Sequence, residues 1–317
     1  MFGFGKKPVS KPTISGPTIT QPGVGQGATR TFEQRLQDFG PGLSTFLARV
    51  WRERASIPLT DAVRGPDRIY DFYSGPSVYR PYNVMELAEF LDETMEIADD
   101  YILSPQGIDA DQLTSEGVRV HGRDLWRTFY HVLSTDEPDY AIRSRVYVNA
   151  ASVASSHEIM KVVIGQFGRN TGLWEVKNAG PGCIRLDTIV AYLYSDDSAL
   201  ELVEVLKRTA RDHKDWFGTE LPPLVTERAP GIGTAGEPPA IELYRRTGAR
   251  HSFGSFYSLV CWVALKGVPD VGTVKADGRH FLDNILFTLR LLQVDPANPT
   301  RFPAIRALET WYRNSVR

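Results

Sequence analysis

The spacing of hydrophobic and polar positions changes along this chain, from a helical period near the N-terminus to an alternating period further on. Apolar residues in the range 32–54 recur every three to four positions, and a Gly-Pro-Gly interruption at 40–42 predicts two short helices or one broken helix. Amphipathic patterns predict a strong helix over 83–101 and a shorter one over 121–133. The Pro- and Tyr-rich range 64–82 is expected to be loop with short extended pieces.

Alternating patterns with β-branched residues follow in the middle of the chain and indicate strands separated by helices. Ser155 or Ser156 is expected to cap the first of these helices, with Glu158 three residues after Ser155 in a capping box. Asp196 or Asp197 is expected to cap the second helix. The predicted order is strand 145–149, helix 155–167, strand 173–177, a Gly-Pro-Gly turn at 180–182, strand 185–194 and helix 199–213.

The C-terminal third combines a loop signal with helical signals. The range 222–239 is dense in Pro and Gly and predicts a long functional loop. The range 256–265 is apolar on all sides, which indicates a buried helix, and amphipathic helices are expected over 277–292 and 302–316. The whole order predicts an α+β fold, a mainly antiparallel sheet flanked by helices, with those of the strand region on one face.

Three parts make up the predicted domain organisation. Residues 1–30 contain six Gly, four Pro and four basic residues without an acid or an apolar run, so we expect a disordered tail that is not a signal peptide. Residues 31–135 are expected to form a helical N-terminal portion. Residues 136–317 are expected to form an α+β core that packs with that portion into one compact unit.

Composition excludes several classes of protein. The 317 residues include 36 Lys and Arg against 38 Asp and Glu, a formal net charge of −2, so we expect neither a nucleic-acid nor a membrane partner. No apolar run approaches the roughly 20 residues of a membrane span. Cys183 and Cys261 are too few for a disulfide framework, and the six histidines show no metal-binding spacing. We therefore expect reduced thiols, no metal and a cytoplasmic location.

Common motifs of nucleotide-binding proteins and hydrolases do not predict the function of this chain. The sequence contains no GxxxxGK[ST], GxSxG or HRD motif. A G-x-G-x-x-G match at 231–236 lies in the Pro-rich loop, without a preceding strand or a following helix, so it does not predict a dinucleotide site. We expect no cofactor.

Charged and phenolic residues gather on the predicted strands. Residues two positions apart on a strand lie on one face, so Arg145 and Tyr147 share a face of the first strand. Lys177 projects from the second strand, and the third begins at Arg185 and carries Tyr192 near its end. If these strands pair, one sheet face collects two arginines, a lysine and several phenols. By itself this pattern favours the solvated face of an antiparallel sheet.

The order of these elements nevertheless resembles a family of lyases. R-x-Y-x-N from Arg145, a helix, a strand with Lys177, and R-x-D-x-I-V-x-Y-L from Arg185 resemble the stand-alone lyases of class V lanthipeptide and thioamitide biosynthesis. Those lyases are similar to a group of plant-pathogen type III effectors and, more distantly, to the phosphothreonine lyases of enteric pathogens. Further matches are the loop segment 230–233 with Glu237-Pro238 and the segment 250–254, so the resemblance spans about residues 80–265.

This resemblance implies β-elimination of phosphate from phosphoserine or phosphothreonine, which leaves dehydroalanine or dehydrobutyrine without metal or nucleotide. Lys177 is the expected base for the Cα proton. An unperturbed lysine has a pKa near ~10.4, so neighbouring guanidinium groups and partial burial must lower it, whereas a salt bridge from Glu175 would raise it. Tyr147 is the expected acid for the bridging oxygen, at a place where the enteric enzymes carry histidine, and His251 is its rival.

The same resemblance implies a set of phosphate-binding residues. Arg145 and Arg185 are expected to hold phosphate oxygens through the forked geometry of guanidinium. Arg250 precedes the start of a buried helix, whose unpaired N–H groups favour an anion. Tyr192 is expected to orient the phosphate or an enolate-like intermediate, and Asp187 to position an arginine.

Three functions are compatible with these expectations. The first is phosphate elimination from a phosphorylated, ribosomally made precursor peptide; a separate Ser/Thr kinase would install the phosphate and a separate cyclase could use the alkene. The second keeps the reaction but makes the chain a secreted type III effector acting on host phosphoproteins, with residues 1–30 as a secretion signal. The third is a non-catalytic module that binds phosphopeptide or assists the kinase.

Overall fold

The chain divides into two compact units, Met1–Arg30 and Thr31–Arg317. The expected tail, the helix expected over 83–101 and almost all of the one expected over 302–316 lie outside the residues that the structure describes. The structure is a computed structural model that describes residues 30–74, 78–79, 118–121, 124–130, 143–167, 173–180, 183–238 and 253–302.

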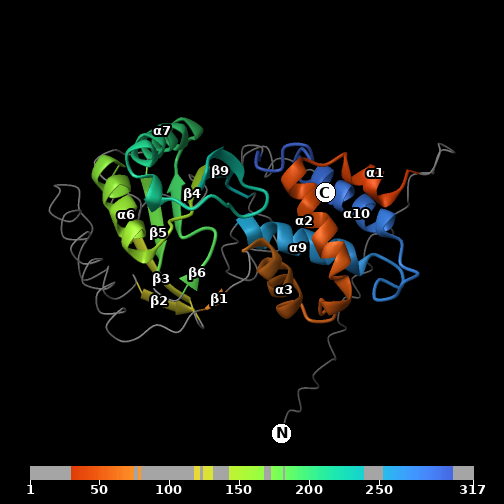
Figure 1. Ribbon diagram of the computed structural model, residues 1–317. Coiled ribbons are helices and arrows are strands. Elements are labelled where there is room, and N and C mark those ends of the chain that lie inside the picture. Colours follow the sequence, from red (N-terminus) through yellow and green to blue (C-terminus); the bar gives the residue numbers. More distant parts are fainter. Residues whose placement is uncertain are drawn as a thin grey trace, which may run out of the picture. The chain divides into compact units, whose positions relative to one another are not determined.

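An antiparallel sheet of seven strands carries four of the eight candidate residues (Figure 1). Its strand order is β2-β3-β5-β7-β4-β9-β8, and every neighbouring pair is antiparallel. A separate two-stranded ladder joins β1, Val78–Tyr79, to β6, Cys183–Ile184. The strands of the large sheet are β2 Val118–His121, β3 Asp124–Tyr130, β4 Ser144–Val148, β5 Leu173–Ala179, β7 Ile189–Leu193, β8 Thr226–Ala229 and β9 Ile232–Gly236.

One face of this sheet is apolar and is covered by α6, Val153–Phe167, and α7, Asp196–Asp212 (Figure 1). Alternate residues of β4 and β7 point into this layer, where Val146, Ile189 and Leu193 are completely buried. They pack with apolar residues of both helices, and burial of this kind contributes about 25 cal/mol per Å² of apolar surface. This layer forms a hydrophobic core of its own.

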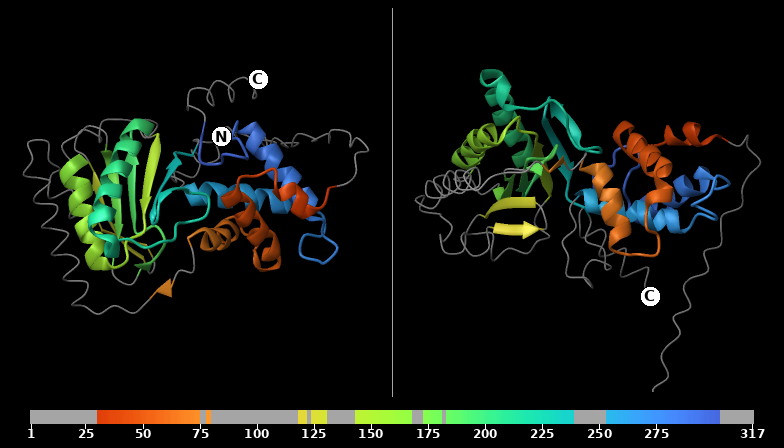
Figure 2. Two further views of the ribbon diagram at one scale, coloured as in Figure 1. Left: turned by 45° about the horizontal axis from the view of Figure 1, so that its top comes forward. Right: turned by 60° about the horizontal axis from the view of Figure 1, so that its bottom comes forward.

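The opposite face packs against a second group of helices (Figure 2). Tyr147 and Val190 of the sheet belong to the same hydrophobic core as residues of these helices, α9 among them. The α+β fold is therefore confirmed, but the expectation of helices on one face was wrong, because helices cover both. The helices of the second group are α1 Phe32–Leu36, α2 Pro41–Arg52, α3 Arg64–Tyr73, α9 Phe253–Lys266 and α10 Gly278–Leu291.

The start of α2 shows how the local sequence sets an element. Pro41 occupies the first helical position, where its missing N–H costs nothing. The buried residues of the helix recur every three to four positions and form one stripe. The Gly-Pro-Gly interruption thus separates two short helices, α1 and α2, as expected. The residues of the stripe are Leu43, Phe46, Leu47 and Val50.

Serine residues cap both helices of the apolar layer, one position or more before the expected caps. In α6, the Ser155 N–H donates to Ser152 Oγ at 3.0 Å and the Ser152 N–H donates to Ser155 Oγ at 2.9 Å, a reciprocal cap that starts at Ser152. In α7, Ser195 Oγ accepts from the Ser198 N–H at 3.0 Å. The predicted caps, Ser155 or Ser156 and Asp196 or Asp197, were therefore shifted.

Three expected elements were wrong for identifiable reasons. The helix expected over 121–133 is the hairpin of β2 and β3, whose aromatic and branched residues pair with β5. The expected loop over 64–82 contains α3, which starts where Asp61 Oδ1 accepts from two successive N–H groups, at 3.0 and 2.9 Å. The expected loop over 222–239 contains the β8–β9 hairpin, and Gly231 provides the positive φ of 69° at its turn.

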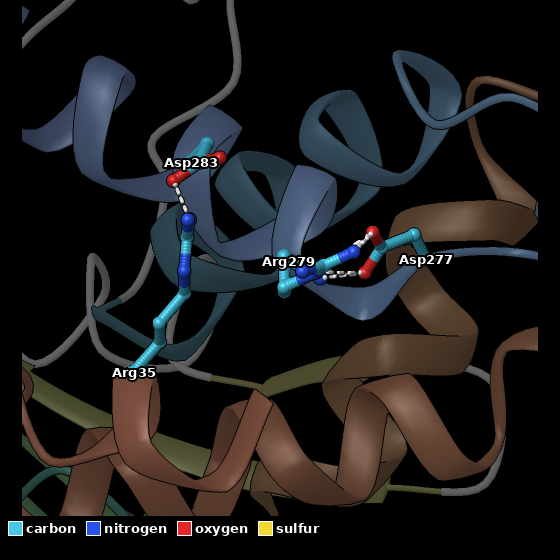
Figure 3. A network of polar contacts seen from close by, with 4 residues as sticks. All are labelled: Arg35, Asp277, Arg279 and Asp283. Carbon is cyan, nitrogen blue, oxygen red and sulfur yellow. Dashed lines mark hydrogen bonds and ion pairs between the residues drawn. The ribbon is translucent and has the colours of Figure 1, made fainter. Parts of the chain in front are cut away.

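Polar contacts tie α10 to α1 on the helical side. Arg35 of α1 forms an ion pair with Asp283 of α10 (Figure 3). Asp277 caps α10, because its Oδ1 accepts from the Arg279 N–H at 2.9 Å, and the same carboxylate binds the Arg279 side chain (Figure 3). Both pairs are partly exposed, so each contributes little to stability.

We expect the stability of the fold to fall in mild acid because of His157. This histidine is buried on α6, and burial, with a smaller contribution from Lys161, lowers its pKa to about 4. Between pH ~6.5 and about 4 the unfolded chain then binds more protons than the folded one, so the free energy of unfolding decreases as the pH falls through this range, by on the order of 1–2 kcal/mol. Urea unfolding of His157→Gln should show a flatter pH dependence between these limits.

The matched control is His280→Gln, which removes an exposed histidine of α10. It should keep the wild-type slope. Equal slopes for the wild type and His157→Gln would contradict the assignment.

Candidate functional site

The register of the sheet places the sequence-predicted residues in two adjacent cross-strand rows. In the first row, Lys177 of β5 lies opposite Val190 of β7, which lies opposite Tyr147 of β4. In the second row, Tyr192 of β7 lies opposite Arg145 of β4. Because the rows are two residues apart along each strand, all of these side chains belong to the sheet face that packs against the helical group. Strands that are far apart in the sequence thus bring the predicted base, the predicted acid and one arginine together.

The ring of Tyr192 joins the two cations. The Arg145 Cζ atom lies 4.6 Å from the centroid of this ring, and Lys177 Nζ lies 5.0 Å from it. Both distances are within the range of a cation–π interaction. A phenol therefore holds the amine and the guanidinium on one patch of the sheet face.

Arg145 is paired with Glu237, an acid placed directly after β9. Its Nε donates to Glu237 Oε2 at 2.6 Å and its Nη2 donates to Oε1 at 2.8 Å, a bidentate ion pair. The Arg145 side chain is only 4% exposed. Burial alone would lower its pKa. The Glu237 carboxylate and the nearby phenols raise the pKa by more than burial lowers it, so the net pKa lies well above its ordinary value. The guanidinium stays charged, with Nη1 outside this pair.

Arg185 and Asp187 lie in the connection between β6 and β7. Arg185 Nε donates to Asp187 Oδ1 at 2.7 Å, and its Nη2 donates to Asp187 Oδ2 at 3.2 Å and to the Tyr70 hydroxyl at 2.8 Å. Asp187 is buried, and the Arg185 side chain is almost so. Asp187 thus contacts Arg185, while the positioning role of the acid and the phosphate-binding role of the arginine stay predictions.

Tyr147 keeps its proton firmly. Burial raises its pKa far above the ordinary value of a phenol; Arg145 opposes this shift, while Tyr192 and Asp187 add to it. From the sequence, we expected nearby cations to lower the pKa of this phenol. The effect of Arg145 has the expected sign, but burial outweighs it, because an ionised phenol loses its hydration inside the fold.

A second phenol, Tyr73, reaches the same place from α3. Its hydroxyl is completely buried, and the phenol of Tyr147 is its hydrogen-bonding neighbour. Burial raises its pKa well above the ordinary value, and Tyr147 and Asp187 raise it further. The contact between the two phenols joins α3 to β4 at the candidate site.

Gly254 allows α3 to approach this closely. A Cβ atom at this glycine would lie 2.2 Å from Tyr73 Cδ1 and 2.7 Å from Tyr70 Cε2, so only glycine fits between α9 and α3. The sequence argument assigned the start of this helix to anion binding. Packing of α9 against α3 is enough to explain why residue 254 is a glycine.

Two of the predicted site residues, Arg250 and His251, lie outside the described residues, and so does the side chain of Glu175. The geometry adds Glu237, Tyr70 and Tyr73, for which the sequence analysis expected no role. The spacing of the two tyrosines, three positions apart on α3, would have placed them on one helix face if this range had been predicted as a helix.

Within the described ranges, no group of three or more His, Cys, Asp or Glu residues is arranged to hold a metal ion. None of the described helices is both long and apolar enough to cross a bilayer. The Cys261 thiol is buried, and burial raises its pKa, which makes it a poor nucleophile.

The fold defines an α+β protein whose charged and phenolic residues gather on one face of an antiparallel sheet. The sequence model of the HopA1 effector protein family matches residues 123–301, more than half of the chain. The chain therefore belongs to the HopA1 effector protein family. This match confirms the expected similarity to effectors of plant pathogens. No curated protein matches the sequence.

Two solved structures have a similar fold. One is the effector protein from Pseudomonas syringae pv. tomato strain DC3000, with a TM-score of 0.57 and 16% identity over 85% of this chain and 100% of the other. The second is the effector protein from Pseudomonas syringae pv. syringae strain 61, with a TM-score of 0.52 and 16% identity over 83% of this chain and 98% of the other. At this identity the likeness concerns the fold alone.

We expect Glu237→Gln to destabilise the protein, because it leaves the buried Arg145 charge without its carboxylate. The free energy of unfolding should decrease by about 1–3 kcal/mol, measured by urea denaturation. Glu204→Gln is the matched control, because it removes an exposed pair with Lys207 on α7. A midpoint for Glu237→Gln as little changed as that of the control would show that the pair does not support the fold.

Proposed function

We propose that this protein eliminates phosphate from phosphorylated Ser or Thr in a polypeptide. The observation that carries the proposal is the convergence of Lys177 and Arg145 on the ring of Tyr192, next to the protonated phenol of Tyr147. A base, an acid and a cation on one face are the groups that this reaction requires. The resemblance of the motifs to phosphate-eliminating lyases supports the same reaction.

Each group has a defined task in the proposed reaction. Lys177, in its neutral form, takes the Cα proton of the phosphorylated residue. The electron pair of the broken C–H bond forms the Cα=Cβ double bond, and the bond from Cβ to the bridging oxygen breaks. Tyr147 donates its proton to that oxygen, and phosphate leaves. The raised pKa of Tyr147 keeps the proton in place at neutral pH, as the role of an acid demands.

The paired state of the arginines limits how phosphate can bind. The forks of Arg145 and Arg185 engage Glu237 and Asp187, so an incoming phosphate meets guanidinium groups whose best-aligned N–H bonds are in use. Phosphate would bind to Arg145 through Nη1, or would displace the Glu237 carboxylate. The pairing also holds the guanidinium in place before substrate arrives, which lowers the entropy cost of binding.

Because the chain belongs to an effector family, we favour a host phosphoprotein as the substrate and a secreted enzyme. Two solved structures with a similar fold are also effector proteins, which agrees with this choice. Maturation of a precursor peptide, with a kinase and a cyclase as partners, is the second candidate. The order of R-x-Y-x-N, Lys177 and R-x-D-x-I-V-x-Y-L favours it, because this order resembles the stand-alone lanthipeptide lyases.

Lys177→Ala should reduce elimination about 100- to 10,000-fold, because the Cα proton then has no base. The assay incubates the full chain with synthetic phosphoserine and phosphothreonine peptides and follows them by mass spectrometry. Elimination produces an alkene that adds a thiol, whereas hydrolysis by a phosphatase returns the hydroxyl and adds none. Lys161→Ala, an exposed lysine on α6, is the control and should keep full activity.

Activity of Lys177→Ala equal to that of the control would remove the base assignment. Wild-type protein that binds phosphopeptide without converting it would favour the non-catalytic binding module. Comparing a host phosphoprotein digest with phosphorylated precursor peptides then separates the two substrate candidates.

Tyr147→Phe and His251→Gln together identify the acid. If Tyr147 protonates the leaving oxygen, Tyr147→Phe should lower kcat by about 100-fold or more and leave KM nearly unchanged, because the ring still packs against Phe253. His251→Gln should then have a small effect. The reverse order of effects would transfer the role to His251.

A further inference from the structure

A cavity of about 830 Å³ lies beside the candidate site, next to the first residue of β4. Arginines from three separate parts of the chain line it: Arg143 directly before β4, Arg228 on β8 and Arg301 after α10. Among the described residues that line it, Asp196 is the one acid, and it accepts a hydrogen bond from the hydroxyl of Ser144. The cavity therefore carries an excess of positive charge.

These arginines are available to a ligand. None of them forms an ion pair with a carboxylate within the described parts of the chain, unlike Arg145 and Arg185. Arg228 donates from Nε to Thr234 Oγ1 at 2.9 Å, a contact with a neutral group that leaves its charge uncompensated. All three arginines are exposed. An anionic ligand would balance the positive charge of these three arginines.

Backbone contacts fix the wall of the cavity. The Gly236 N–H donates to the Thr300 carbonyl at 2.6 Å, and the hydroxyls of Thr226 and Thr300 lie 3.0 Å apart. A Cβ atom at Gly236 would meet the Thr300 carbonyl oxygen at 2.6 Å. The segment that carries Arg301 is therefore held against the ends of β8 and β9, so the cavity is built by the fold.

The cavity is continuous with the candidate site along β4. Arg143 is two residues before Arg145 and follows the same alternation along the strand, and Ala235, the register partner of Arg145, also lines the cavity. The N–H of Glu237, whose carboxylate binds Arg145, donates to the Arg143 carbonyl at 2.8 Å. A strand advances about 3.3 Å per residue, so the cavity starts about two residues from Arg145.

We propose that this cavity binds an acidic segment of the polypeptide substrate, within about two to four residues of the phosphorylated Ser or Thr. The inference rests on the proposed function for its choice of a polypeptide. The three arginines recognise the carboxylates, and the hydroxyls of the lining donate further hydrogen bonds. Recognition of this kind selects substrates by the charge next to the modified residue and leaves the elimination chemistry to the other site.

The experiment measures binding apart from catalysis. The probe is a fluorescein-labelled peptide with an unphosphorylated serine and three aspartates beside it, and fluorescence anisotropy gives its Kd for the full chain at low salt. Arg228→Gln combined with Arg301→Gln should raise the Kd about tenfold. Added salt should also raise it, because exposed charges are screened.

A second double variant, Arg211→Gln with Arg290→Gln, is the matched control, because it removes the same charge from exposed positions on α7 and α10. It should bind like the wild type. Equal losses in both double variants, equal binding of a peptide with asparagine in place of aspartate, or no binding by the wild type would each overturn the proposal. Since the probe carries no phosphate, a failure of the elimination assay leaves this result readable.

Discussion

A guanidinium that is withdrawn from water needs a carboxylate beside it, and the pair of Arg145 and Glu237 meets this requirement in the middle of the sheet. The pair joins β4 to the segment that follows β9, and Tyr192 on β7 stacks against the same guanidinium. The strands that bear the candidate chemistry are thereby held in one arrangement. The charge of the site depends on the same pair, because it decides how much of Arg145 is left for an anion.

The two faces of the sheet have different roles. The face under α6 and α7 is apolar and supplies stability, so the other face can carry charge. That second face is still covered, because α9 and α3 bring aromatic rings and two phenols against it. Covering a charged face raises the pKa of Tyr147 and Tyr73, which an open sheet face would not do.

The effector family and the proposed chemistry rest on different observations. Family membership follows from the sequence match over residues 123–301, and the fold agrees with it at 16% identity. The proposed chemistry depends on individual side chains on one sheet face. Fold alone does not define a reaction, so the argument for elimination stands or falls with Lys177, Tyr147 and the arginines.

Local patterns determined most of the elements: the alternation in β4 and β7, the break before α2 and the apolar surface of α9 were readable from the sequence, because each depends on neighbours within a few residues. The shared face of Arg145 and Tyr147 followed from strand geometry in the same way. Only the tertiary structure decided that β2 and β3 are strands, because β3 gains its hydrogen bonds from β5, far along the chain, and β2 then pairs with β3. It also decided that Glu237 neutralises Arg145 and that Tyr73 meets Tyr147. Long-range contacts of this kind leave no periodic signal, since they depend on which strands become neighbours and which glycine lets two helices approach.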